Sequence, residues 1–272
     1  MRTRISLTTL LGLALLAGIG SAHAQGREEG RLLTAMQVVQ ELRATPDEFV
    51  PTRLLERAYG LAIFPDMTKA AFFLGGKRGN GVLVVRDASG RFSNPIFINI
   101  TGGSFGFQFG VQSTDLVLVF TTRSSIDKIT GGKLELGADA SVAAGPVGRA
   151  ASAATDPTFH SEVYSYSRSR GLFAGIALDG SALTIDNLAN SHFYDRGTVR
   201  PADVVSGAVT THSAEAQRFM AAVNRATGAD MSASAAPPPR SAPSTTPPPA
   251  APAPEGTRTF PLQDSKPGQE PH

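Results

Sequence analysis

The sequence predicts an α+β fold in which N-terminal helices pack on a curved, glycine-rich antiparallel sheet or small barrel, followed by a disordered proline-rich tail. Three observations predict it: apolar residues recur at helical spacing near the N-terminus, strand-like alternation begins at Leu61, and 18 of the 28 glycines lie between Gly60 and Gly180. Glycine costs about 1 kcal/mol relative to alanine inside a helix, so this density argues against a helical bundle.

The first predicted helix contains an apolar stripe made of Leu32, Ala35, Met36, Val39 and Leu42. Spacings of three and four residues put these side chains on one face of an α-helix. The opposite face mixes arginine with glutamate, whereas a membrane-surface helix usually has a cationic face, so we expect this helix to dock on the protein's own core. Further helices are predicted over residues 52–59, 189–194, 202–205 and 213–225.

Strands are predicted where apolar and polar residues alternate between turn signals. The clearest alternation is at Phe105, Phe107 and Phe109, with small or polar residues between them. Glycine inside such strands marks bends, which is why we expect a curved sheet or small barrel. The predicted strands cover residues 70–75, 81–86, 96–100, 104–112, 116–120, 134–142, 163–169 and 172–178.

Both ends of the chain are predicted to lie outside the folded domain, which we place at residues 25–227. Residues 1–24 resemble a secretory signal peptide, with two arginines, an apolar run over residues 10–19 and a small-x-small site that predicts cleavage after Ala24. That run is shorter than the roughly 20 residues of a spanning helix, and an uncleaved anchor is the alternative. Twelve of the 19 prolines fall between Pro237 and Pro271, which predicts a disordered tail over residues 228–272.

The sequence has no cysteine, which excludes disulfides, thiolate metal sites, a cysteine nucleophile and a lipid-modified N-terminal cysteine. Without residues 1–24 the chain has 23 basic and 23 acidic residues, and this balance argues against nucleic-acid binding. The predicted signal peptide indicates that the protein is periplasmic or secreted, and the lack of cysteine indicates that it is not a lipoprotein. The histidines do not pair at metal-binding spacing, and we expect no metal site and no cofactor.

One motif is typical of an enzyme, because Gly102-Gly103-Ser104-Phe105-Gly106 matches the G-x-S-x-G nucleophile elbow of serine hydrolases. That chemistry needs the serine on a sharp turn between a strand and a helix, with a histidine and an acid in reach. The strand-like alternation continues through Ser104, so no helix is expected to begin there. We therefore predict no catalytic residue, and a serine hydrolase acting through Ser104 is the least favoured alternative.

The most basic part of the predicted domain surrounds a glycine-rich segment, residues 75–81. This segment lacks the G-K-[ST] ending of a P-loop and leads into a strand, so it predicts a hairpin and no nucleotide site. Basic side chains there favour contact with anionic lipid headgroups, at about 1 kcal/mol each near a charged membrane, and a solvated hairpin is the alternative. The candidate headgroup-binding residues are Lys69, Lys77, Arg78, Arg86 and Arg91.

Several motifs together resemble the SYLF domain family, also called the Ysc-type actin-binding domain. They are Ala62-Ile63-Phe64-Pro65, the glycines of the predicted hairpin, Gly90-x-Phe92-Ser93-x-Pro95, and the segments over residues 136–149 and 165–175. Phe92 stands where the family usually has tryptophan. The resemblance covers about residues 30–205. It implies a non-enzymatic module, whose eukaryotic members are associated with phosphoinositide-rich membranes and filamentous actin.

Two function hypotheses follow from the resemblance and the residues. The leading hypothesis is a non-enzymatic protein of the bacterial cell envelope that binds a phospholipid or a membrane surface. The alternative is a protein-interaction or scaffold module, including an actin-binding effector that is secreted from the cell. We expect no nucleotide and no nucleic acid among its partners.

Overall fold

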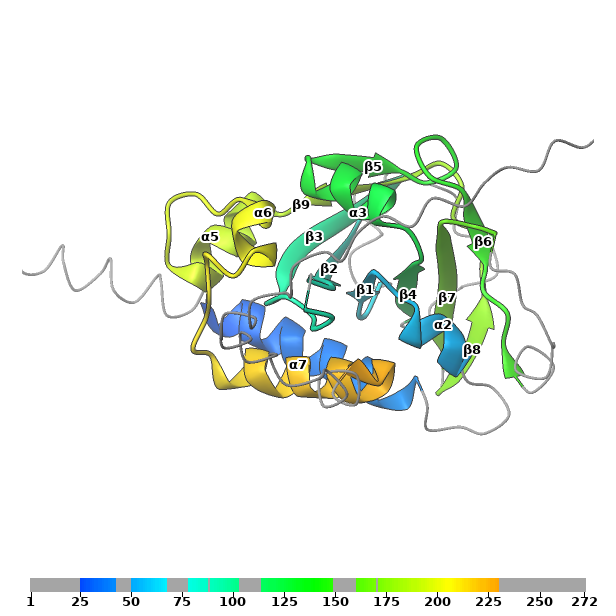
Figure 1. Ribbon diagram of the computed structural model, residues 1–272, viewed down its shortest axis with the longest axis horizontal. Coiled ribbons are helices and arrows are strands. Elements are labelled where there is room, and N and C mark those ends of the chain that lie inside the picture. The colour runs from blue at the N-terminus through cyan, green and yellow to red at the C-terminus, as the bar shows by residue number, and fades with distance from the viewer. Residues whose placement is uncertain are drawn as a thin grey trace, which may run out of the picture. The chain divides into compact units, whose positions relative to one another are not determined.

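The computed structural model describes residues 25–42, 50–67, 78–87, 89–102, 114–148, 160–169 and 171–229, which form helices and one nine-stranded sheet (Figure 1). The described helices are residues 25–41, α2 (Thr52–Glu56), α3 (Arg123–Thr130), α5 (Asn187–Tyr194), α6 (Pro201–Val205) and α7 (Ala214–Thr227). The strands are β1 (Gly60–Phe64), β2 (Arg78–Val85), β3 (Ile96–Gly102), β4 (Asp115–Phe120), β5 (Lys133–Glu135), β6 (Val142–Ala144), β7 (Val163–Ser169), β8 (Leu172–Gly175) and β9 (Ser181–Ile185).

The strands follow the order β5-β9-β3-β2-β1-β4-β7-β6, and β8 pairs with the second half of β7. The sheet curls into a half-barrel, so the predicted α+β class with a curved sheet is confirmed (Figure 1). Among the described strands only β6 and β7 are parallel, which departs from a fully antiparallel sheet. Residues 145–162 join these two strands and are long enough for the crossover that a parallel pair requires.

The N-terminal helix packs on the sheet through the apolar stripe that its sequence predicts. Leu32, Ala35 and Val39 are fully buried in the core. Burying a leucine or valine side chain contributes about 1.5–3 kcal/mol, so the stripe is the main attachment of this helix. Figure 1 shows the helix and α7 on the same side of the sheet, and the Ser213 hydroxyl at the start of α7 donates a 3.1 Å hydrogen bond to Glu29.

A buried ionic cluster fixes the beginning of the same helix to the sheet. Arg31 Nη2 lies 3.0 Å from Glu28 Oε2, Arg31 Nη1 lies 3.8 Å from Asp186 Oδ2, and the guanidinium carbon stacks 5.2 Å from the centre of the Phe97 ring. Burial raises the pKa of Glu28 and lowers the pKa of Arg31, while the charge of each residue opposes the effect on the other. Each charge is therefore held at a desolvation cost that its partner offsets only in part.

Helix α5 is attached to β3 by a side-chain carboxamide that pairs with a backbone N–H and carbonyl, as a neighbouring strand would. The buried Asn190 Oδ1 accepts a hydrogen bond from the Phe97 N–H (2.9 Å), and Asn190 Nδ2 donates to the Phe97 carbonyl (2.8 Å). Asp186 caps the helix by accepting from the Ala189 N–H at 3.1 Å. The Tyr194 hydroxyl then donates to the Pro95 carbonyl at 2.7 Å. Three of these hydrogen bonds join the short helix to the end of the sheet, and the fourth caps the helix itself.

Close backbone approach around β7 requires glycine at one position. A Cβ atom at Gly145 would overlap the ring of Tyr166, which is fully buried. The Tyr166 hydroxyl donates to the Pro146 carbonyl at 3.2 Å, and burial raises its pKa, so the hydroxyl stays protonated. The residue after β6 is therefore fixed as glycine by the volume of one aromatic side chain.

Several parts of the described chain differ from the sequence prediction. The strand predicted over residues 134–142 is divided, because β5 ends at Glu135 and a turn follows in which Gly137 has φ of 90° and Asp139 accepts the Glu135 N–H at 2.8 Å. Helix α3 and strands β1 and β9 were not predicted as elements. The strands predicted over residues 70–75 and 104–112 lie outside the described residues. None of the helices in the described ranges is long and apolar enough to cross a membrane.

Candidate functional site

Of the five basic residues predicted to bind headgroups, two have described side chains. Lys69 and Lys77 lie outside the described residues. Arg78 opens β2, where its backbone pairs with Thr101, and its side chain is also outside the description. Arg86 follows β2 directly and pairs with Phe92, while Arg91 lies in the turn between them. The structure therefore reports on the part of the candidate site around this turn.

Asp87 builds the turn. Its Oδ1 accepts hydrogen bonds from the Ser89 N–H (2.8 Å), the Ser89 hydroxyl (2.6 Å) and the Arg91 N–H (3.0 Å). Gly90 has φ of 84°, a left-handed conformation that favours glycine. Burial opposes ionisation of Asp87, but these hydrogen bonds outweigh it and hold the pKa of its carboxyl below the usual value. The turn thus carries a fixed negative charge at neutral pH.

Arg86 points inward and joins the end of α2 to the turn through three backbone carbonyls. Its Nε donates to the carbonyl of Ala58 (2.9 Å), Nη1 to that of Gly90 (3.0 Å) and Nη2 to that of Glu56 (3.2 Å). Its guanidinium carbon lies 4.7 Å from the centre of the Phe92 ring, and burial lowers its pKa. Because each of its nitrogens already has a partner, we leave Arg86 out of any binding surface.

Arg91 has the opposite environment. Its side chain is exposed, and the one hydrogen bond that the structure gives it joins Nε to the Ser89 hydroxyl at 3.3 Å. Among the described residues, neither terminal nitrogen has a hydrogen-bond or salt-bridge partner. A guanidinium with both terminal nitrogens free can hold a carboxylate or phosphate through two parallel hydrogen bonds.

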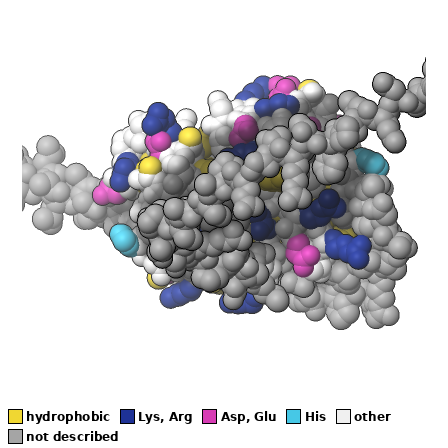
Figure 2. Space-filling view, in the orientation of Figure 1, with side chains coloured by type: hydrophobic (Ala, Val, Ile, Leu, Met, Phe, Trp, Pro, Cys, Tyr) yellow, Lys and Arg dark blue, Asp and Glu magenta, His cyan; other side chains and the backbone are white. Residues whose placement is uncertain are grey.

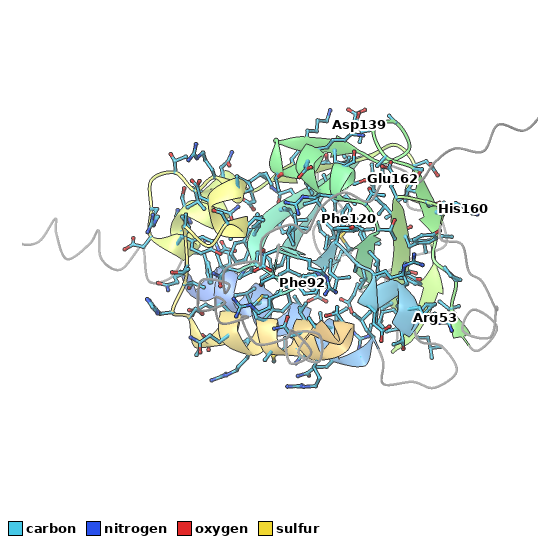
Figure 3. All side chains as sticks on the ribbon, in the orientation of Figure 1. Arg53, Phe92, Phe120, Asp139, His160 and Glu162 are labelled. Carbon is cyan, nitrogen blue, oxygen red and sulfur yellow. The ribbon has the colours of Figure 1, made fainter. Side chains whose placement is uncertain are left out.

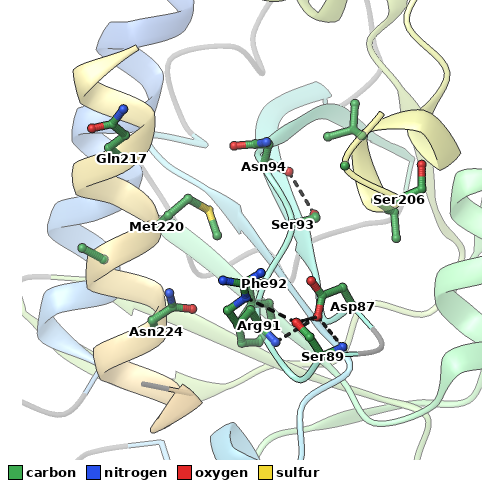
Figure 4. Close-up of a pocket in the computed structure, with 14 residues that line it drawn as sticks. Asp87, Ser89, Arg91, Phe92, Ser93, Asn94, Ser206, Gln217, Met220 and Asn224 are labelled. Atoms are coloured by element: carbon green, nitrogen blue, oxygen red, sulfur yellow. Dashed lines mark hydrogen bonds between the residues drawn. The ribbon is translucent and has the colours of Figure 1, made fainter. Parts of the chain in front are cut away.

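Arg91 opens onto a groove of about 800 Å³ (Figure 4). One wall is the turn and the segment that follows it, another is α7, and the end of α6 closes the third side. The polar lining includes Asn94, Gln217 and Asn224, and the apolar lining includes Met220. The sequence prediction missed this groove, since its walls come from segments more than 100 residues apart that only the fold brings together.

Four more exposed arginines lie on or directly after the helices next to this groove: Arg53 on α2, Arg57 directly after it, and Arg218 and Arg225 on α7. Helix α2 contacts α7, and Arg86 joins the end of α2 to the turn. Figure 2 shows basic side chains projecting where Figure 1 places α7 and α2, and Figure 3 labels Arg53 at the outer side of α2. We call these four residues together with Arg91 the arginine rim.

The arginine rim is only partly neutralised by acidic side chains. Glu215 lies 3.8 Å from Arg218, and Glu56 is exposed on α2. The carboxylate of Asp87 is engaged in the turn. Five arginines in the rim against these three carboxylates leave a surplus of positive charge on this part of the surface.

The sequence raises two other kinds of chemistry, a serine hydrolase and a metal site. Ser104, the candidate hydrolase nucleophile, lies outside the described residues. Within the described ranges, no three histidine or acidic side chains are grouped so that they could hold a metal ion.

Comparison with known proteins defines the class of this chain. Residues 101–226, from the end of β3 to α7, match the family model Ysc84, described as a Las17-binding protein actin regulator. The SH3 domain-containing YSC84-like protein 1 of Xenopus laevis is 32% identical over 187 residues, which are 68% of this chain and 55% of the relative. Its human counterpart is 35% identical over 166 residues, or 61% of this chain and 48% of the relative.

Yeast relatives match as well. Protein YSC84 of Saccharomyces cerevisiae is 39% identical over 151 residues, which are 54% of this chain and 32% of that protein. The chain belongs to the Ysc84 family, the SYLF family that its motifs resemble. It spans about half the length of the vertebrate relatives and a third of the yeast one.

Proposed function

We propose that this chain is a non-enzymatic binding protein whose Ysc84-family domain attaches to an anionic membrane surface. The observation that carries the proposal is the arginine rim, five exposed arginines on or directly after α2, on α7 and in the turn between β2 and β3. Each cation next to a charged bilayer contributes about 1 kcal/mol, so five of them favour binding by several kcal/mol. Lys69 and Lys77, which the sequence also predicts to bind headgroups, lie outside the described residues, as does the side chain of Arg78. Because the sequence predicts a signal peptide, the proposed location of the protein is the bacterial cell envelope.

Vesicle co-sedimentation tests this function. The chain from residue 25 onward, which keeps every described residue, is mixed with vesicles containing anionic lipid or only zwitterionic lipid. We expect binding to the anionic vesicles that weakens as salt rises, because exposed charges are screened beyond about 10 Å at 0.1 M salt. The variant Arg53→Glu, Arg57→Glu, Arg225→Glu is expected to lose most of this binding. Equal binding of variant and wild type would exclude the arginine rim as the membrane contact.

A second function, binding of a protein partner, is favoured by the groove beside Arg91 and by the family description as a Las17-binding actin regulator. Co-sedimentation with filamentous actin tests whether actin, which this description gives as the regulated protein, binds the chain directly. Sedimentation of the chain with actin, unchanged by anionic vesicles, would favour the protein-binding function. A chain that stays in the supernatant with actin and sediments with vesicles would favour the membrane function.

A further inference from the structure

The groove beside Arg91 has the dimensions of a short extended peptide. Its α7 wall presents Gln217, Met220 and Asn224, spaced three and four residues apart on one stripe of the helix. At 1.5 Å per residue, the seven steps from Gln217 to Asn224 cover about 10 Å. An extended chain rises about 3.3 Å per residue, so three residues span this wall.

The hydrogen-bonding groups of the groove match a peptide backbone. The side-chain carboxamides of Asn94, Gln217 and Asn224 line it, and among the described residues none of the three has a hydrogen-bond partner. A carboxamide both donates and accepts, as a peptide unit does. A backbone laid along α7 would therefore satisfy groups that the folded chain leaves unpaired.

The charge of the groove favours a single carboxylate over a polyphosphorylated headgroup. The free guanidinium of Arg91 lies in the same turn as the ionised carboxylate of Asp87. A ligand carrying several phosphate charges would meet this fixed negative charge as well as the arginine. One carboxylate can pair with the terminal nitrogens of Arg91, since the hydrogen bond of this side chain to Ser89 uses only Nε.

The positions of Arg91, the charged residue of the groove, and Met220, its apolar residue, determine how far apart the matching side chains of a ligand must be. Figure 4 places Arg91 toward the Asn224 end of the groove, with Met220 one helical turn further along α7. One turn is about 5.4 Å, and side chains two residues apart on an extended chain are about 6.6 Å apart on the same side. We propose that the groove binds an extended segment of a partner protein in which an acidic residue contacts Arg91 and an apolar residue two positions away covers Met220. This inference rests on the protein-binding function above.

Peptide titration tests the proposal. Fluorescein-labelled Gly-Glu-Ala-Leu-Gly is titrated with the full chain and its fluorescence anisotropy is measured, and Gly-Lys-Ala-Leu-Gly serves as the charge-reversed probe. In Arg91→Glu we expect affinity for the glutamate peptide to fall about tenfold to a hundredfold, the loss that a charge-assisted hydrogen-bond pair predicts. The same variant should gain affinity for the lysine peptide. Arg123→Glu makes the same charge change at an exposed position on α3, which does not line the groove, and should bind like wild type.

A second variant tests the location without changing the anchor. Ala221→Arg adds a long side chain to an exposed position that lines the groove, and it should abolish binding of the glutamate peptide while leaving thermal unfolding unchanged. Absence of saturable binding by the wild type up to about 1 mM would overturn the proposal. Equal affinity of wild type, Arg91→Glu and Ala221→Arg would also overturn it. Actin co-sedimentation that persists alongside either result would leave the protein-binding function in place and remove only the groove from it.

Discussion

Substitution of Arg86 is expected to destabilise the fold, although this residue belongs to the basic stretch that the sequence predicts to bind lipid. Arg86→Ala removes three hydrogen bonds from a charged donor and leaves the carbonyls of Glu56, Ala58 and Gly90 without it. Half-burial reduces the contribution of each bond to about 1 kcal/mol, and the contact with the Phe92 ring adds about 0.5–1 kcal/mol. The free energy of unfolding should fall by about 3–4 kcal/mol.

Urea denaturation followed by circular dichroism measures this change, and an unaltered slope against urea confirms that only stability has changed. Arg91→Ala is the matched control, because its exposed side chain makes one weak hydrogen bond and its removal should change stability by less than about 0.5 kcal/mol. Arg86→Lys should recover only part of the loss, since one ammonium cannot reach three carbonyls in the planar geometry of a guanidinium. Equal stability of Arg86→Ala and Arg91→Ala would refute the reasoning.

Three further substitutions test other parts of the fold. Asn190→Ala leaves the buried N–H of Phe97 unpaired, while the Phe97 carbonyl keeps the Asp186 N–H at 3.0 Å, so the substitution should cost about 1–3 kcal/mol in urea denaturation; a loss under about 0.5 kcal/mol would contradict the strand-like role of this side chain. Gly145→Ala should cost about 1–3 kcal/mol through overlap with a buried tyrosine ring, whereas Gly197→Ala, with open space around it, should be neutral. Burial raises the pKa of Glu28, so its ionisation disfavours the folded state, and stability should decline as pH rises above the usual value of 4.5; Glu28→Gln should flatten this decline in denaturation curves taken from pH 4 to 8.

The parts of the fold that the sequence predicts are those with a sustained periodic pattern. The N-terminal helix has five apolar residues on one face, and the buried strands have continuous apolar runs. Helix α3 has only Ile126 and Ile129 as apolar side chains, one helical turn apart, and such a pair is too short to define a period. Strand β9 is five residues long and mixes small with apolar residues, so it resembles a loop.

The candidate site was predicted in part, because proximity in sequence was the only guide to proximity in space. Arg86 and Arg91 are neighbours in the basic stretch, yet the first is turned toward backbone carbonyls and the second faces a groove. The other arginines of the rim lie on or directly after α2 and on α7, at the two ends of the folded part of the chain. No local pattern predicts that these helices meet, since their contact depends on how the sheet between them curls.

The half-barrel has consequences for how copies of this protein behave when they are concentrated, for example along a surface. An open sheet presents unpaired backbone groups that can recruit strands from other molecules. Here both terminal strands of the path, β5 and β6, are three residues long, and β5 carries the ion pair between Lys133 and Glu135 at its exposed positions. Borders of three residues, one of them charged, give an incoming strand little to pair with. The protein can therefore crowd without polymerising through these borders, and contacts between copies are left to its side chains.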